Sequence, residues 1–289
     1  MINYIYSQWY CNFTWFRLLI PAAFLYKQLI SIRKHLYARG IFKSSKFSCP
    51  VWIVGNITVG GSGKTPLVQW LVEYVSDQGL KPAVITRGYK KDALEEGDEV
   101  RMLRRHLSCP IGVGKNRVEV TQRLLSLHPE IDIIISDDGL QHYAIQRDIE
   151  IIAVDGYKLF GNQHYLPAGP LREGVSRIND TDLVVYKDNT TYNYHFRLQP
   201  KRFINIQNPN LYYTPEEFIQ LSSGKTVNAI AGIAHPNSFF NALFNIGINS
   251  KNNPYPDHYT YTAEDFNKFA SSSYVIMTEK DSVKCRGIV

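Results

Sequence analysis

The sequence contains no uninterrupted apolar run long enough to cross a bilayer. Its most apolar segment, residues 9–26, is interrupted by Arg17 and Pro21 and is followed by Lys27, whereas a spanning helix needs roughly 20 consecutive, mostly apolar residues. No positive charge precedes the apolar part, and Arg17 lies inside it, unlike in a secretory signal. We therefore expect neither a membrane-spanning helix nor a signal peptide.

Cysteine is scarce and widely spaced. The chain has four cysteines, Cys11, Cys49, Cys109 and Cys285, and no C-x-x-C pair. This spacing predicts neither a zinc site nor a disulfide framework, and it fits a reducing cytoplasm. Internal repeats and low-complexity tracts are also absent from the sequence.

Acidic residues are missing from residues 1–47, although this segment carries seven of the 32 lysines and arginines. The remaining 25 basic residues nearly balance the 26 acidic ones, so the net charge of +6 belongs to this segment. Because it is also rich in Trp, Phe and Leu, we expect an amphipathic helix in residues 1–40 that lies at a membrane surface, with no nucleic acid as partner. The simpler alternative is a helix packed on the protein with a solvated basic face.

The sequence VWIVGNITVGGSGKTP, residues 51–66, predicts a phosphate-binding loop. A short apolar strand leads into a glycine-rich turn and then into an amphipathic helix over residues 67–75. Backbone N–H groups of such a turn bind a polyphosphate, the lysine reaches its terminal phosphates, and the threonine hydroxyl binds Mg²⁺. Thr58 replaces the first glycine of the common pattern, and an incidental glycine-rich turn is the alternative. The residues of the predicted ATP site are Gly60, Gly61, Ser62, Gly63, Lys64 and Thr65.

Further apolar, strand-like runs alternate with helical stretches at residues 82–86, 110–113, 131–136, 149–154 and 183–186. This alternation predicts an α/β fold, a mostly parallel P-loop NTPase-like sheet with helices on both faces. We expect this kinase-like domain over residues 41–190 and a linker with extended strands over 191–225. A smaller α/β domain should follow over 226–289, with strands at 227–230 and 274–277 and helices at 236–244 and 263–270.

Two carboxylates follow the apolar run 131–136. Asp137 and Asp138 stand at the carboxyl end of this predicted strand, the edge where open α/β sheets bind ligands, so they should face the phosphate-binding loop and Mg²⁺. Since adjacent strand residues point in opposite directions, we expect only one of the two to reach the metal. Gln141 and His142 add polar groups at the same rim, and an Asp-Asp-Gly surface turn is the alternative.

Other groups of polar residues are each weak evidence for a functional site when taken alone. Arg87 ends a predicted strand and is placed to bring a guanidinium near phosphate, while Asp98 lies in an acidic stretch typical of a solvated loop. Arg172 and Glu173 end a rigid proline-containing loop that could equally be a surface turn. His258 is a lone histidine, which is more often structural than catalytic.

Taken together, the motifs resemble those of the tetraacyldisaccharide 4′-kinases, the lipid A 4′-kinases of Gram-negative bacteria. The resemblance covers essentially the whole chain and is carried, in order, by GNITVGGSGKTP, TRGY, GDE, DDGLQH, LPAGPLRE, AGIAHPNSFF, PDH and MTEKD. It implies ATP-dependent phosphorylation of the 4′-hydroxyl of an acylated glucosamine disaccharide 1-phosphate at the cytoplasmic face of the inner membrane. It also implies a peripheral, monotopic attachment.

The resemblance assigns roles to particular residues. It implies an acid–histidine dyad of Asp98 and His258 that accepts the hydroxyl proton. Beside this dyad, we expect the catalytic residues Lys64, Asp138 and Arg172, the Mg²⁺ ligands Thr65, Asp137, Asp138 and Glu173, and the substrate-binding residues Arg87, Gln141 and His142. Members of the family usually add a strand and a helix after the segment matching MTEKD, whereas the given sequence ends at Val289.

Without the family resemblance, the residues also allow a different class of function. A membrane-surface GTPase or ATPase switch that controls a protein partner would share the phosphate-binding loop. Thr278, Glu279, Lys280 and Asp281 follow a predicted strand as a guanine-reading N/T-K-x-D motif would, although Glu279 stands where that motif has lysine.

Overall fold

The computed structural model describes residues 9–10, 18–88, 98–233, 236–257, 259–269, 273–285 and 287–288. Contacts divide the chain into two compact units, Met1–Arg197 and Leu198–Val289. Each unit has its own sheet and its own buried cluster of apolar side chains.

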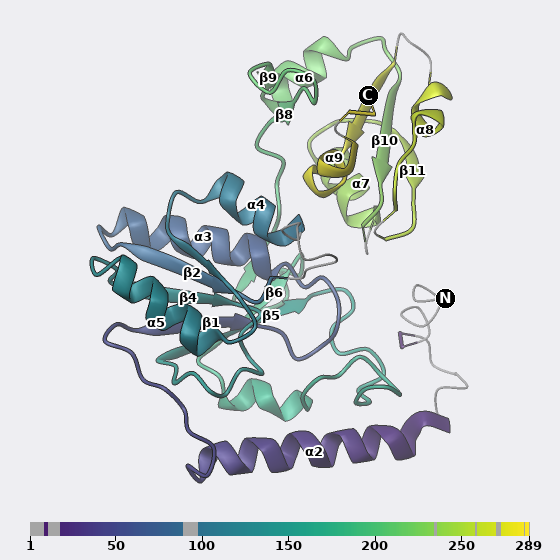
Figure 1. Ribbon diagram of the computed structural model, residues 1–289. Coiled ribbons are helices and arrows are strands. Elements are labelled where there is room, and N and C mark those ends of the chain that lie inside the picture. Colours follow the sequence, from purple (N-terminus) through teal and green to yellow (C-terminus); the bar gives the residue numbers. More distant parts are fainter. Residues whose placement is uncertain are drawn as a thin grey trace. The chain divides into compact units, whose positions relative to one another are not determined.

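Unit 1 is built on a seven-stranded sheet in the order β3-β2-β4-β1-β5-β6-β7, in which every neighbouring pair is parallel (Figure 1). The predicted parallel α/β fold is therefore confirmed, and each predicted strand of this unit lies within two residues of an observed one. The strands are β1 (Val51–Gly55), β2 (Pro82–Thr86), β3 (Ile111–Val113), β4 (Ile133–Asp137), β5 (Ile149–Asp155), β6 (Leu183–Lys187) and β7 (His195–Phe196).

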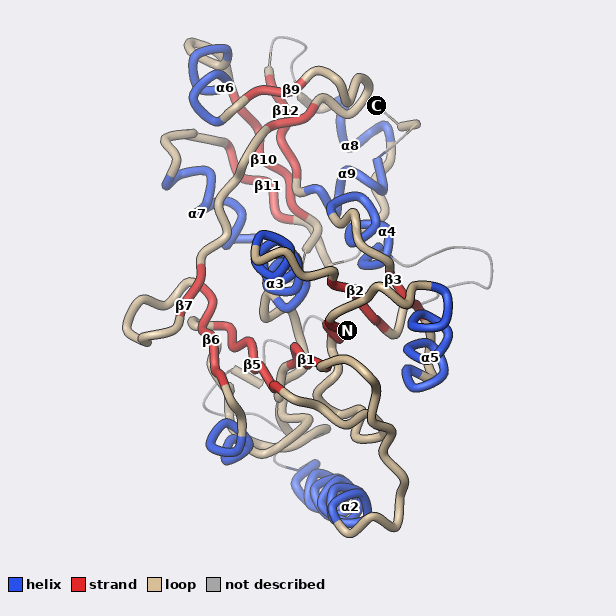
Figure 2. Tube along the Cα trace, turned by 90° about the vertical axis from the view of Figure 1, so that its left-hand side faces the viewer, coloured by secondary structure: helices blue, strands red, loops and turns tan. Residues whose placement is uncertain are grey.

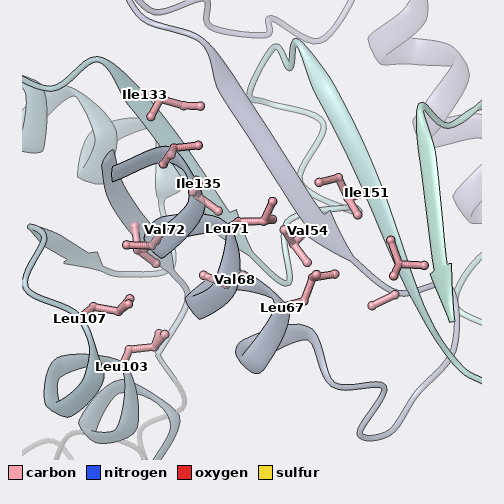
Figure 3. Packing of buried hydrophobic residues seen from close by; sticks show 14 residues of the cluster. Val54, Leu67, Val68, Leu71, Val72, Leu103, Leu107, Ile133, Ile135 and Ile151 are labelled. Atoms are coloured by element: carbon pink, nitrogen blue, oxygen red, sulfur yellow. The ribbon is translucent and has the colours of Figure 1, made fainter. Parts of the chain in front are cut away.

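Helices cover both faces of this sheet. Helices α3 (Lys64–Asp77) and α4 (Asp98–His106) pack on one face, where Val68, Leu71 and Leu103 meet alternate residues of the strands (Figure 3). Helix α5 (Arg117–Leu127) packs on the other face. Because side chains alternate along a strand, the continuous apolar runs of the central strands supply both buried faces.

Aspartates at the amino edge of the sheet hold the starts of three strands. The carboxylate of Asp148 accepts from Val51 N at 2.7 Å, that of Asp132 from Lys81 N at 2.9 Å, and that of Asp182 from Glu150 N at 2.7 Å. A hydrogen bond to a charged acceptor is worth about 1.5–3 kcal/mol. These bonds fix where β1, β2 and β5 begin, and so which residues lie at their carboxyl ends.

Helix α2 (Ile20–Ala38) lies at the lower edge of unit 1 in Figures 1 and 2, separated from α3 by the sheet. Ala23 is buried against the unit, and the ring of Tyr37 lies 5.9 Å from that of Tyr143. The other side of α2 is apolar and exposed, and its residues Phe24, Leu25, Leu29 and Ile32 are each more than half exposed. Among the described residues, no helix combines the length and apolarity that crossing a membrane requires.

Unit 2 contains a three-stranded parallel sheet in the order β11-β10-β12 (Figure 2). Its strands are β10 (Val227–Ala231), β11 (Lys251–Pro254) and β12 (Tyr274–Met277), and its helices are α6 (Pro215–Leu221), α7 (Pro236–Asn245), α8 (Ala263–Asn267) and α9 (Glu279–Cys285). A two-stranded antiparallel pair, β8 (Phe203–Ile204) with β9 (Tyr212–Tyr213), precedes them. Strand β11 was not predicted, because its sequence Lys-Asn-Asn-Pro has no apolar pattern.

The segment expected as a linker, residues 191–225, contributes to both units. Strand β7 pairs with β6 in the large sheet, whereas β8, β9 and α6 belong to unit 2. The boundary between the units lies at Arg197 and Leu198.

Candidate active site

The phosphate-binding loop joins β1 to α3 at the carboxyl edge of the large sheet. Helix α3 begins at Lys64, and its N-cap residue Gly63 has a left-handed backbone with φ +79°. At Gly60 and Gly61, an added Cβ would meet no atom within 4 Å, so this part of the loop faces open space. A helix N-terminus preceded by an open glycine turn is a binding site for anions such as phosphate.

The segment before the glycines is held rigidly. The Asn56 side-chain oxygen accepts from Thr58 N at 2.9 Å and from the Thr58 hydroxyl at 3.1 Å. Val59 N donates to Pro170 O at 2.8 Å, and Arg172 N donates to Ile57 O at 2.7 Å. The loop containing Pro170 and Arg172 therefore lies directly against the phosphate-binding loop.

Asp137 lies beside the threonine of the phosphate-binding loop. In the β1–β4 pair, Asp137 is in register with Val54, one residue before the end of β1. The hydroxyl of Thr65 donates to Asp137 Oδ2 at 3.4 Å, and Asp137 is 2% exposed. Mg²⁺ bound to a nucleotide takes one or two carboxylates together with phosphate oxygens and water. The Thr65 and Asp137 pair is suited to this ion.

Asp138 contacts two cations. Lys64 Nζ lies 3.6 Å from its Oδ1, and Arg172 donates to both carboxylate oxygens at 3.1 Å. Burial disfavours the charged form of Asp138, but Lys64 and Arg172 outweigh it and hold the pKa of this carboxyl below its ordinary value. Asp138 has a left-handed backbone, φ +50°, so the chain leaves the strand at this residue and both carboxylates face the loop.

Arg117, the first residue of α5, is a residue that the sequence analysis missed. It is 3% exposed and donates to the Ser136 hydroxyl at 3.2 Å. Burial lowers the pKa of Arg117, while the charges of Asp138 and Asp137 oppose this shift. The sequence offers no signal for this residue, because no motif surrounds it.

Glu173 belongs to a buried polar network rather than to the Thr65 and Asp137 pair. Its Oε1 accepts from Gln141 Nε2 at 2.9 Å, and its Oε2 accepts from the Tyr143 hydroxyl at 2.7 Å and lies 3.6 Å from Arg177 Nε. Arg177 in turn bonds Glu150, which Arg147 also contacts at 2.6 Å. Both carboxylate oxygens of Glu173 therefore already interact with other side chains.

Gln141 has a similar bridging position. Its side-chain nitrogen donates to Asn56 O at 3.1 Å as well as to Glu173, and its oxygen lies 3.5 Å from an Arg172 nitrogen. Gln141 thus connects the phosphate-binding loop to the loop that carries Arg172.

His142 lies among arginines. Burial, followed by the positive charges of Arg117 and Arg33, lowers the pKa of His142 to about 4, and Arg147 and Arg87 add to this effect. His142 Nε2 is buried and has no hydrogen-bond partner among the described residues. Arg87, exposed at the end of β2, completes the predicted substrate-binding set. A neutral imidazole surrounded by guanidinium groups is a favourable place for an anionic ligand.

The predicted dyad is divided between the units. Asp98 is the first residue of α4 in unit 1, whereas His258 belongs to unit 2 and lies outside the described residues. Its neighbour Asp257 accepts from Lys280 Nζ at 3.3 Å.

Asp281, the last residue of the Thr278–Asp281 segment, is fully buried in unit 2. It accepts from Gly232 N at 3.0 Å and from the Thr278 hydroxyl at 2.7 Å. Its carboxylate therefore holds two loops of unit 2 together.

Comparison with known proteins gives the site its context. The model of the family described as tetraacyldisaccharide-1-P 4′-kinase matches residues 15–289. A tetraacyldisaccharide 4′-kinase of Methylobacillus flagellatus is 43% identical over 98% of this chain and 87% of its own length. One of Coxiella burnetii is 42% identical over 93% of this chain and 82% of its own.

A solved structure agrees with these relatives. The crystal structure of LpxK from Aquifex aeolicus in complex with ATP matches with a TM-score of 0.70 and 27% identity, over 95% of this chain and 91% of that one. The match therefore extends over both units. The chain belongs to the tetraacyldisaccharide-1-P 4′-kinase family.

Proposed function

We propose that this protein transfers the γ-phosphoryl group of ATP, with Mg²⁺, to the 4′-hydroxyl of tetraacyldisaccharide 1-phosphate in lipid A biosynthesis. We place this reaction at the cytoplasmic face of the bacterial inner membrane. One observation carries the proposal in a chain of this family. Lys64, Thr65, Asp137, Asp138 and Arg172 converge on the open phosphate-binding loop.

Positioning and charge neutralisation do most of the work in phosphoryl transfer. The backbone of residues 60–65 holds the phosphates, and Lys64 neutralises charge on the terminal ones. Thr65 and Asp137 hold Mg²⁺, which supplies further neutralisation of the phosphate oxygens when bound. Asp138 keeps Lys64 and Arg172 in place. Both cations then stabilise the negative charge that develops on the transferred phosphoryl group.

Asp98 and His258 are the proposed proton acceptor for the sugar hydroxyl. A histidine suits this role because its ordinary pKa lies near neutrality, and a carboxylate that orients the ring raises its basicity. Glu173 is proposed here as a positioning residue for Gln141 and, through it, for Arg172, in place of the metal-binding role expected from the sequence.

The arginines around His142 are proposed to attract the anionic 1-phosphate of the acceptor. Arg87 and His142 supply contacts at this rim, and Gln141 holds the rim against the phosphate-binding loop. Arginine is suited to phosphate because its planar fork makes paired, charge-assisted hydrogen bonds.

Helix α2 is proposed to lie at the membrane surface. Its exposed apolar residues are joined by Lys27, Arg33 and Lys34, and the helix packs on the unit that contains the nucleotide site. Apolar side chains at the lipid boundary combined with basic residues facing anionic headgroups define an interfacial helix.

The alternative of a GTPase or ATPase switch is not supported. Relatives that match this chain are named tetraacyldisaccharide 4′-kinases. The Thr278–Asp281 segment, which suggested a guanine-reading motif, uses its aspartate inside unit 2.

Turnover with an acylated glucosamine disaccharide 1-phosphate tests the function directly. We expect ATP consumption to require this lipid and to yield one 4′-phosphorylated product per ATP, detected by mass spectrometry. Lipid-independent GTP hydrolysis at a higher rate than lipid phosphorylation would favour the switch instead.

Asp137→Asn should distinguish the role of Asp137 from that of Asp138. Because Asp137 is the proposed metal ligand, the Mg²⁺ concentration for half-maximal activity should rise at least about tenfold, as ligand-sphere changes do. Asp155→Asn is the matched control, since Asp155 ends the neighbouring strand β5 and accepts from its own loop. Magnesium titrations of kcat provide the measurement, and an unchanged Mg²⁺ requirement in Asp137→Asn would contradict the assignment.

Asp98→Ala and His258→Ala should each lower kcat by roughly 10² to 10⁴ with little change in the KM for ATP, since a general base acts on the hydroxyl. The double variant should be no slower than the worse single variant, because the two residues act as one unit. His128→Ala, at the C-cap of α5, serves as the control. Multiplication of the two single losses would show that the residues do not act together.

Leu25→Ser combined with Leu29→Ser should release the protein from anionic vesicles at high salt. The basic residues contribute roughly 1 kcal/mol each and are screened by salt, whereas the apolar contacts persist. Leu127→Ser is the matched control, because Leu127 is as exposed as Leu25, at 64%, but lies at the end of α5. Liposome flotation at low and high salt gives the result, and wild-type protein that fails to float at low salt would leave α2 a structural helix only.

A further inference from the structure

Trp9 belongs to the basic amino-terminal segment, and it is buried in unit 1. It is 6% exposed, and its indole nitrogen donates to Pro167 O at 3.3 Å. Its backbone carbonyl accepts from Asn162 N at 2.9 Å. A buried tryptophan needs an acceptor for its indole N–H, and the loop of residues 158–172 supplies one. Trp9 therefore packs on the protein and joins two separate points of this loop.

The beginning of the 158–172 loop fits closely around the amino-terminal segment. Gly161 has a left-handed backbone, φ +56°, and a Cβ placed on it would lie 2.9 Å from Trp9 O and 3.0 Å from Tyr10 Cε1. A side chain at this position would push the segment away from the loop. The Lys158 ammonium lies 4.7 Å from the centre of the Tyr10 ring, as in a cation–π contact. Both Trp9 and Tyr10 thus contact the loop directly.

The end of the same loop lies against the phosphate-binding loop. The Asn162 side chain donates to Ala168 O at 3.0 Å, and Ala168 is itself buried. Pro170 O accepts from a backbone N–H of the phosphate-binding loop at 2.8 Å. Arg172 ends the 158–172 loop and donates to both carboxylate oxygens of Asp138. A continuous set of contacts therefore runs from the amino-terminal segment to the guanidinium at the site.

We infer that Trp9 is a positioning residue for Arg172: by holding the 158–172 loop in place, it fixes this guanidinium beside the phosphate-binding loop. The inference rests on the proposed phosphoryl transfer, in which Arg172 stabilises charge on the transferred group. Trp9 acts through the loop, and a shift of about 1 Å in a group that acts on the transition state can cost on the order of 10²-fold in rate. The amino-terminal segment thus supports catalysis in addition to its proposed attachment at the membrane.

Kinetics of Trp9→Ala, alone and combined with Arg172→Ala, test the inference. Trp9→Ala should lower kcat about tenfold, because a misplaced cation stabilises the transition state less, while the KM for ATP stays within about twofold. In the Arg172→Ala background it should lower kcat further by no more than about twofold, since two residues that act through one group are not additive. An acceptor with shortened, soluble acyl chains keeps membrane attachment out of the result.

Two further variants control this experiment. Trp70→Ala removes a tryptophan of α3 that is 56% exposed, and it should change kcat less than about twofold in either background. Trp9→Phe keeps an aromatic ring and loses the indole N–H, so it should lower kcat only about threefold. Where Trp9→Ala does not fold, the same cycle with Trp9→Phe decides. A Trp9 variant as active as wild type would overturn the inference, as would a loss that persists undiminished in the Arg172→Ala background.

Hydrogen exchange followed by mass spectrometry needs no turnover, so it separates this inference from the proposed function. In the folded Trp9 variant, amides of residues 162–172 and the Val59 amide should exchange at least about tenfold faster than in wild type, because their hydrogen bonds open more often. Exchange in β5 should not change. Loop exchange that equals the wild-type rate would overturn the inference whether or not lipid is phosphorylated. Wild-type protein that phosphorylates no lipid would contradict the proposed function, and faster loop exchange would still support the hold of Trp9 on the loop.

Discussion

The parallel pairing of β1 with β4 is the constraint on which the site depends. It places Val54 opposite Asp137, so the strand that leads into the phosphate-binding loop and the strand that carries the carboxylates end at the same edge. The hydrogen bond from Thr65 to Asp137 and the ion pair of Lys64 with Asp138 follow from this register. A shift of one residue would turn each strand's side chains to the opposite face and separate these groups.

A second layer of contacts makes the phosphate site continuous with the proposed membrane-facing side of unit 1. Arg172 and Glu173 are neighbours in sequence but point to different partners: Arg172 holds Asp138, and Glu173 holds Gln141 and Tyr143. Tyr143 in turn lies against Tyr37 of α2. The loop that ends in these two residues therefore connects the nucleotide-binding edge to the helix proposed to contact lipid, through side chains that are half-buried except for the buried Glu173.

The sequence predicted the parts of this architecture that depend on local pattern. The apolar runs located β1, β2, β5, β6, β10 and β12 closely, and the glycine-rich turn located the start of α3. It did not predict β11, an edge strand of polar residues. It expected extended strands in residues 191–225, where β7 lies, but not that β7 joins the large sheet through pairing with β6. Strand alternation predicted that only one of the two aspartates reaches the metal, and this stays a prediction. The left-handed backbone of Asp138 lets both carboxylates face the loop. The places of Arg117, Glu173 and Trp9 depend on tertiary contacts that no local pattern encodes.

The balance of charge at this edge explains why the site suits phosphate. Asp137 and Asp138 face Lys64, Arg172 and the buried Arg117, so cations outnumber carboxylates among these residues before any ligand is considered. His142 adds nothing to this excess at neutral pH, because burial and the nearby guanidinium groups lower its pKa to about 4. Its proton is therefore absent in the folded protein between pH 4 and about 6.5, where the unfolded chain would bind one. Keeping this imidazole neutral disfavours the folded state as pH falls through that interval, and the attraction for anions rests on arginine and lysine, whose charge is constant there.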